Sequence, residues 1–237
     1  MRKQLFVVAA LTSSGLLAAQ SAEFPLASTA GLTTHNVNVA PASHRGRAGV
    51  RVTIRDDVRD RLLAERQRGA PQGEVIEQLV MLDGLEFGDG VIEAEISGEA
   101  QTSVFEGARG FVGIAFRVQK DLHTYDAFYL RPTNGRATDQ VRRNHSVQYI
   151  SHPAWPWFRL RKEFPKKYEA YVDLVPGEWT KIRIEVRGEQ ARLFVHGAEQ
   201  PTLIVNDLKT GAGARGGVAL WIDAGTVAHF RNVVVTK

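Results

Sequence analysis

Short stretches in which apolar and polar residues alternate dominate the chain from about residue 35 onward. The segments at 49–55, 90–97 and 181–187 read GVRVTIR, GVIEAEIS and KIRIEVR. A period of two is the pattern of a strand with one face buried and the other in solvent. About eight such segments, separated by turn residues, predict an all-β fold in which antiparallel sheets form a sandwich or jelly roll.

One segment departs from this alternation. After Asp56 and Asp57 the sequence continues VRDRLLAERQRG, in which Val58, Leu62 and Leu63 share one helical face. This spacing predicts one short helix near residues 57–68. Because the chain shows no internal repeat, low-complexity tract or linker, we expect a single domain over residues 23–237.

The N-terminus has the order of an export signal. Arg2 and Lys3 precede an apolar stretch at 5–17, and small residues follow at 18–22. This order is typical of a cleavable secretory signal, so residues 1–22 are predicted to be a signal peptide that is cut after position 21 or 22. An uncleaved anchor is the alternative, but the apolar stretch is shorter than the roughly 20 residues that span a membrane.

The absence of cysteine narrows the class of protein further. With 0 Cys, the chain has no disulfide framework, no Cys-ligated metal centre and no lipoprotein anchor. No second long hydrophobic stretch follows the first, so no membrane span is expected in the mature protein. The predicted location is periplasmic or secreted, with folding that rests on the hydrophobic core alone.

The C-terminal half carries an ordered set of motifs. They are WTKIRIEV at 179–186, ARLFVHG at 191–197, GGVALWI at 216–222 and AHFRNV at 228–233, with an earlier strand LDGLEFGDGVIE at 82–93. This order resembles the concanavalin A-like lectin/glucanase superfamily, and is similar in particular to bacterial 3-keto-disaccharide hydrolase-related and laminin G-like domains. The resemblance covers roughly residues 78–236. His196 stands where the superfamily usually has Asn.

The resemblance implies a concanavalin A-like jelly roll of two curved antiparallel sheets, with a concave face that commonly binds carbohydrate. It implies no single reaction, because the superfamily includes glycosidases, lyases and purely binding modules. We therefore expect an exported carbohydrate-active protein. Cleavage of a glycosidic linkage, by hydrolysis or elimination, is favoured slightly over a non-catalytic binding or envelope-interaction module.

The acidic residues of one strand argue against the glucanase mechanism. Glycoside hydrolysis needs two carboxylates that face one groove. Glu93 and Glu95 share a strand face, but Ser97 stands where the glucanase subgroup has a third acid. The alternation with apolar neighbours instead predicts a solvated strand face.

A strongly basic and aromatic segment is the best candidate for the ligand site. Residues 131–167 contain nine Lys or Arg against Asp139 and Glu163, and they include Trp155 and Trp157. Aromatic rings stack on sugar rings, and guanidinium groups bind carboxylates or sulfates with two hydrogen bonds. The expected partner is a carbohydrate, with an anionic one favoured; export argues against nucleic acid. The alternative is that the aromatic side chains are core residues and the charges form a solvated face.

Alternation along 142–151 would place Arg143, His145 and Tyr149 on one strand face, and these are the candidate catalytic residues. In a lyase, His145 or Tyr149 would remove the C5 proton of a uronate whose carboxylate is neutralised by arginine or an amide. A structural histidine remains the alternative for His145. The candidate substrate-binding residues are Tyr125, Tyr129, Arg131, Asn134, Arg136, Arg142, Asn144, Gln148, His152, Trp155, Trp157 and Arg159.

No cofactor or metal is predicted. The sequence has no HExxH motif and no EF-hand spacing. Asp83, Asp89 and Asp223 could hold a structural Ca²⁺, but their spacing does not support such a site.

Overall fold

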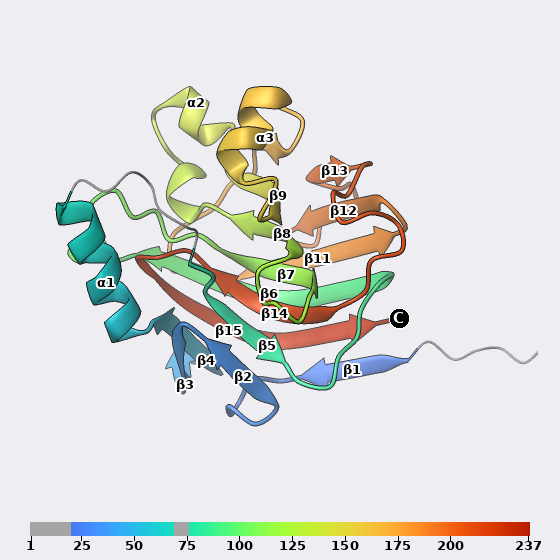
Figure 1. Ribbon diagram of the computed structural model, residues 1–237, viewed down its shortest axis with the longest axis horizontal. Coiled ribbons are helices and arrows are strands. Elements are labelled where there is room, and N and C mark those ends of the chain that lie inside the picture. The colour runs from blue at the N-terminus through green and yellow to red at the C-terminus, as the bar shows by residue number, and fades with distance from the viewer. Residues whose placement is uncertain (1–19, 69–75) are drawn as a thin grey trace, which may run out of the picture.

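Two antiparallel sheets packed face to face form the protein in the computed structural model, which describes residues 20–68 and 76–237 (Figure 1). The first sheet has the strand order β13-β12-β11-β6-β15-β4-β3, with β1 paired to β15. Its strands are β1 (Ser21–Phe24), β3 (Val37–His44), β4 (Arg47–Ile54), β6 (Gly90–Ala100), β11 (Thr180–Arg187), β12 (Gln190–Val195), β13 (Leu203–Val205) and β15 (Thr226–Thr236). This architecture confirms the predicted all-β jelly-roll sandwich.

The second sheet carries most of the predicted ligand-site residues. Its order is β10-β9-β8-β7-β14-β5-β2. Its strands are β2 (Leu32–His35), β5 (Leu79–Leu82), β7 (Val112–Val118), β8 (Tyr125–Leu130), β9 (Val147–His152), β10 (Glu169–Ala170) and β14 (Gly217–Ile222). Every residue of β7, β8 and β9 is buried. One face of these strands packs in the core, and the other is covered by the segments that follow β8 and β9.

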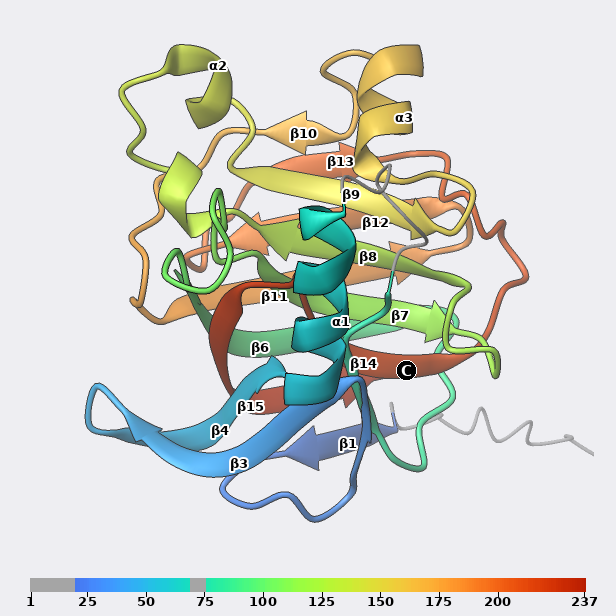
Figure 2. The same ribbon diagram turned by 60° about the vertical axis from the view of Figure 1, so that its left-hand side comes forward.

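The helices lie outside the two sheets. They are α1 (Asp56–Gln67), α2 (Gln140–Arg143), α3 (Trp157–Glu163) and a 3₁₀ turn η1 (Pro132–Asn134). Helix α1 agrees with the predicted helix near residues 57–68. It packs through Val58 against Ile54 and Phe105 in a small second core cluster. Helices α2 and α3 were not predicted, and Figures 1 and 2 show them beside β9 at the edge of the second sheet.

The predicted strand through residues 142–151 is wrong in its first half. Residues 140–143 form α2, whose first turn is capped by the Asp139 carboxylate on the backbone N–H groups of Val141 and Arg142. Strand β9 begins only at Val147. Asp is a strong helix N-cap, and here this local hydrogen bonding prevails over the alternation pattern. Arg143 and His145 therefore do not share a strand face with Tyr149.

The predicted signal peptide lies mostly outside the described residues. Ser21 and Ala22, at its predicted end, belong to β1 and pair with Thr236 and Val235. Cleavage after position 21 would leave Ala22 to Phe24 paired with β15.

A buried arginine ties the loops at one end of the sandwich together. Arg117 is fully buried and has a left-handed backbone conformation, with φ +55°. Its guanidinium donates to the carbonyl oxygens of Gly88 (3.1 Å), Gly211 (2.8 Å) and Gly188 (2.8 Å). It also reaches the Asp89 carboxylate at 3.2 Å. Five N–H donors in one planar group allow a single side chain to satisfy carbonyls from several loops.

Two histidines are stacked on the first sheet. His229 on β15 stacks on His44 of β3, with ring centroids 4.0 Å apart. Burial, followed by the charges of His44 and Arg51, lowers the pKa of His229 to about 4. Because this pKa lies below that of the unfolded chain (about 6.5), protons bind better to the unfolded state, and stability is lost as the pH falls from 6.5 towards 4.

We expect the free energy of unfolding to fall by about 1–2 kcal/mol over this pH range because of His229, after allowance for solvent screening. The variant His229→Gln should remove this part of the pH dependence. Urea unfolding at pH 7 and pH 4.5 measures it. If wild type and variant lose stability in parallel, His229 is not the group responsible.

Candidate functional site

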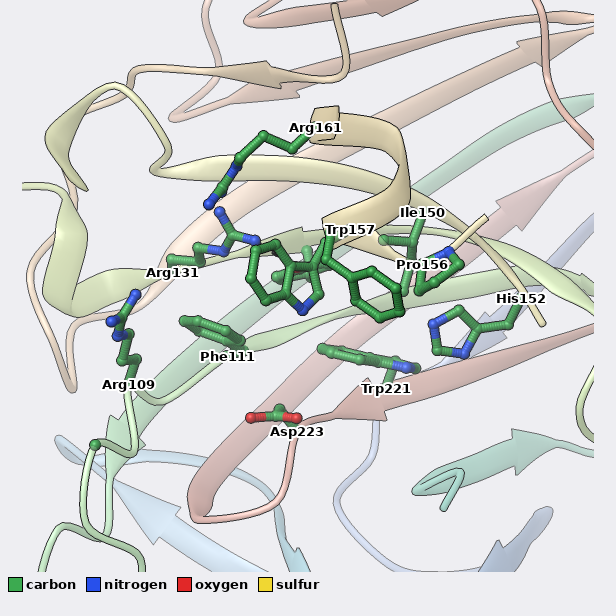
Figure 3. Close-up of a pocket in the computed structure, with 13 residues that line it drawn as sticks. Arg109, Phe111, Arg131, Ile150, His152, Pro156, Trp157, Arg161, Trp221 and Asp223 are labelled. Atoms are coloured by element: carbon green, nitrogen blue, oxygen red, sulfur yellow. Dashed lines mark hydrogen bonds between the residues drawn. The ribbon is translucent and has the colours of Figure 1, made fainter. Parts of the chain in front are cut away.

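A pocket of about 400 Å³ opens on the outer face of the second sheet, beside α3. This volume is in the range of small-molecule sites. Strands β8, β9 and β14 supply its base, and the residues around Trp157 supply its rim (Figure 3). Its lining includes Arg109, Phe111, Tyr129, Arg131, Ile150, His152, Trp157, Phe158, Arg161, Trp221 and Asp223.

Aromatic rings form the apolar part of this pocket. Tyr129 on β8 stacks on Trp221 of β14, with centroids 4.8 Å apart, and it contacts Phe111 at 5.4 Å. Trp157 and Phe158 are partly exposed at the rim, with 37% and 51% of their surface accessible. Exposed aromatic faces beside a cavity are suited to stacking on the C–H faces of a sugar ring.

At one side of the pocket a histidine is held by a buried carboxylate. Nδ1 of His152 lies 2.9 Å from Oε1 of Glu77 and 3.0 Å from the hydroxyl of Tyr125. Tyr125 donates to the other oxygen of Glu77 and accepts a hydrogen bond from Nε1 of Trp221 at 3.0 Å. Burial, followed by the charge of Glu77, raises the pKa of Tyr125 well above its usual value, so its hydroxyl stays a donor.

This hydrogen bonding assigns the tautomer of His152. With Nδ1–H donated to Glu77, the lone pair is on Nε2. Nε2 makes no hydrogen bond within the described part of the chain, and Figure 3 shows the His152 ring directed into the pocket. A histidine oriented by a carboxylate with a free ring nitrogen facing a cavity is the arrangement of a general base.

A second histidine binds the same carboxylate from the outer side. Nδ1 of His123 lies 3.0 Å from Oε1 of Glu77, and the His123 side chain is 34% exposed. His123 does not line the pocket. Glu77, with 4% of its surface exposed, is thus held by Tyr125, His152 and His123 together.

The other side of the pocket is positively charged. Arg131 and Arg161 both donate to the buried carboxylate of Glu169. Burial by itself would raise the pKa of Glu169. The pKa is nevertheless held below its ordinary value by the hydrogen bond and charge of Arg161 and by the charge of Arg131. The pKa of Arg109 is lowered by burial and by repulsion from the neighbouring arginines.

A family model matches residues 47–236, and its description is "3-keto-alpha-glucoside-1,2-lyase-like domain". The chain belongs to this family. The match spans most of the sequence and includes the pocket and every strand from β4 onward. It confirms the resemblance to the 3-keto-disaccharide hydrolase-related domains of the concanavalin A-like superfamily.

Solved structures similar to this lyase-like domain agree with the fold. The carbohydrate-binding module CBM66 from Bacillus subtilis has a TM-score of 0.53 at 13% identity, over 86% of this chain and 95% of that one. A protein of unknown function with a galectin-like fold, also from Bacillus subtilis, has a TM-score of 0.52 at 12% identity, over 92% and 97%. Domain 4 of an extracellular GH43 arabinanase from Geobacillus stearothermophilus, in complex with arabinotriose, has a TM-score of 0.51 at 13% identity, over 92% and 93%.

No curated protein matches the sequence. Among the described residues of this family member, no helix is long and apolar enough to cross a membrane.

The lyase-like domain brings several of the predicted site residues together. Tyr129, Arg131, His152 and Trp157 line the pocket. Tyr125 lies directly behind His152 through the shared hydrogen bond. Gln148 is buried behind Arg131 and accepts a hydrogen bond from it at 3.0 Å.

The three predicted catalytic residues do not meet. Tyr149 is fully buried in the core, donates to Asp126 at 2.6 Å and accepts from the Lys209 backbone at 2.9 Å. It lies on the face of β9 opposite to His152, because side chains alternate along a strand. His145 contacts Glu169 at 3.4 Å and does not line the pocket, and burial lowers its pKa. Arg143 lies over the ring of Tyr171.

The remaining predicted binding residues do not line the pocket. Asn134 is buried and donates to the His145 carbonyl, and Arg142 donates to Asn134. Trp155 packs on Phe164 and is covered by Arg159 at 3.9 Å. Two more residues have surface partners: Arg136 pairs with Asp173, and Asn144 accepts from Gln140.

Sequence reasoning missed the pocket residues that come from outside the basic segment. They include Arg109, Phe111, Trp221 and Asp223. Glu77, which lies behind His152, was also missed, as were Phe158 and Arg161 from inside the segment. Trp221 stands in the GGVALWI motif, which was used as evidence of fold only. No pattern in the neighbouring sequence marks Glu77 as a site residue. Its role arises because the segment before β5 lies close to Tyr125 of β8 and His152 of β9.

The predicted acidic residues have structural roles or lie elsewhere. Glu93 and Glu95 of β6 pair with cations such as Lys181 and Arg47, as a solvated strand face requires. Asp83, Asp89 and Asp223 form no metal-binding cluster, since no group of three His, Cys, Asp or Glu side chains suited to a metal occurs in the described ranges.

Proposed function

We propose that the pocket binds a 3-keto-α-glucoside and eliminates the substituent at C1. The observation that carries the proposal is the Glu77-oriented His152, whose Nε2 faces the pocket. The family description names the same substrate class, a 3-keto-α-glucoside, and a lyase that acts at positions 1 and 2.

The ketone determines the chemistry. A carbonyl at C3 acidifies the proton on C2, and Nε2 of His152 takes that proton. The electron pair of the C2–H bond forms a C2=C3 enolate with the negative charge on the C3 oxygen. The pair then returns to make C1=C2, the C1–O bond breaks, and the departing oxygen takes a proton from water at the open rim. The hydroxide so formed takes the proton held by Nε2 of His152, which restores the base.

The arginine side of the pocket favours this route. Arg109, Arg131 and Arg161 supply a positive field in a partly desolvated site, which stabilises an enolate as it forms. The same field favours a negatively charged carbohydrate.

Elimination fits the site better than hydrolysis. A hydrolase of the ordinary kind needs two carboxylates across the bond that it cleaves. Asp223 is the one carboxylate among the described residues that line the pocket. Elimination needs only one base, without a second carboxylate as acid, because the C3 ketone of the substrate already acidifies the C2 proton.

The test is incubation of the purified protein with a 3-keto-α-glucoside and with the parent α-glucoside. We expect release of the alcohol and an unsaturated 2-hydroxy-3-keto sugar, seen by its enone absorbance and by NMR, from the keto compound only. Release from both compounds at equal rates, or release of a saturated sugar, would contradict elimination.

A non-catalytic carbohydrate-binding module is the second candidate. The exposed rings of Trp157 and Phe158 at the pocket rim favour it, because binding needs only a stacking surface. Ligand binding by calorimetry without product in the assay above would select this candidate.

Export is part of the proposal and is supported by the N-terminal pattern at 1–22. In a bacterial host we expect the protein in the periplasm or the medium, with a mature N-terminus at Ala22 or Glu23. Fractionation and intact-mass measurement test this. A cytoplasmic protein of full mass would contradict it.

A further inference from the structure

The pocket has more positive than negative charge, since Arg109, Arg131 and Arg161 line it against the carboxylates of Asp223 in the lining and Glu169 beside it. Arg131 and Arg161 share the single carboxylate of Glu169. Arg109 lines the same region, and its pKa is lowered by burial and by the charges of Arg142, Arg131 and Arg161. A lowered arginine pKa means that repulsion and desolvation together exceed the attraction of nearby anions.

Two of these guanidinium groups also have unused donors. Nε of Arg131, whose side chain is 4% exposed, and Nε of Arg142 are buried and make no hydrogen bond within the described residues. A buried charged donor without an acceptor is strongly unfavourable, and a negative charge held nearby would offset part of that cost. Arg131 itself lines the pocket.

The separation of the two sides of the pocket leaves room for one sugar ring with its C6 group and a contact of about 3 Å at each end. Arg131 donates to the hydroxyl of Tyr129, and His152 contacts the hydroxyl of Tyr125. These tyrosines are four residues apart on β8, about 13 Å along the strand. Figure 3 shows the arginines on one side and His152 on the other, with Phe111 and Trp221 between them.

From this arrangement we propose that the sugar bound here carries an anionic group, a carboxylate or a phosphate, at C6. The inference rests on the proposed function, which places C2 of the ring at His152. C2 and C5 are opposite corners of a pyranose ring, and C6 is attached to C5. A ring that offers C2 to His152 therefore directs C6 towards Arg109 and Arg131, whose planar guanidinium groups bind carboxylate and phosphate oxygens.

Binding of four sugars without the ketone tests the inference separately from catalysis. The probes are methyl α-D-glucopyranoside, its 6-phosphate, methyl α-D-glucopyranosiduronate and α-D-glucose 1-phosphate, titrated by calorimetry at low salt. We expect at least one of the two C6 anions to bind about 10-fold to 100-fold more tightly than the neutral glucoside. This preference should weaken as salt is added.

Two substitutions locate the preference. Arg109→Gln should reduce this preference for the C6 anion over the neutral glucoside to a few-fold. Arg136→Gln, an exposed arginine paired with Asp173 outside the pocket, is the matched control and should have no effect. Equal affinity for all four sugars, or tightest binding of the 1-phosphate, would overturn the inference. Neither result would affect elimination, which is measured with the keto compound.

Discussion

Replacement of His152 by Asn is expected to reduce the rate of elimination from a 3-keto-α-glucoside by about 10²-fold to 10⁴-fold, the usual contribution of a general base. Asn keeps a side-chain donor for Glu77 but has no nitrogen lone pair to take the C2 proton. Single-turnover kinetics with a C2-deuterated substrate is the measurement. The activity that remains should show a primary isotope effect at least as large as that of the wild type, because abstraction of the C2 proton becomes the slow step.

His123→Asn is the matched control, because His123 binds the same oxygen of Glu77 but does not line the pocket. We expect it to change the rate by less than about tenfold. Glu77→Gln should lower kcat with little change in KM, as a positioning residue does. If His123→Asn is as inactive as His152→Asn, the assignment of the base is wrong.

Replacement of Arg117 by Met is expected to lower the free energy of unfolding by about 3–5 kcal/mol. Met fills a similar volume but donates no hydrogen bond, so the carbonyl oxygens of Gly88, Gly188 and Gly211 would be left without their donor. The left-handed backbone at this position would remain strained. Urea unfolding followed by tryptophan fluorescence measures the change.

Arg187→Met is the control for this effect. Arg187 ends β11 next to Gly188, but its side chain is exposed. We expect a change within about 0.5 kcal/mol, as for most surface substitutions. Similar losses in both variants would show that the network around Arg117 adds no stability of its own.

The sandwich could be predicted because the strands of the first sheet have one buried face and one face exposed to solvent. In β11 the apolar residues Ile182, Ile184 and Val186 are buried and the polar residues between them are not, so alternation in the sequence is read directly as burial. The same reasoning failed at 142–146. There Asp139 caps a short helix, and the sequence pattern does not show which of two local interactions prevails.

The candidate site could be predicted only in part. Residues 125–167 supply one wall of the pocket, and their basic and aromatic character identified Arg131, His152 and Trp157.

The sequence by itself also determined the antiparallel β class and the concentration of positive charge in one segment. Both follow from local properties, which are the composition and the period of the apolar residues. The tertiary structure alone decided that His152 meets Glu77, that Trp221 completes the floor and that Tyr149 is turned into the core. These contacts join residues that are far apart in the chain. In a strand that is buried on both faces, the sequence shows no polar alternation, so it does not reveal which side chains point to which face.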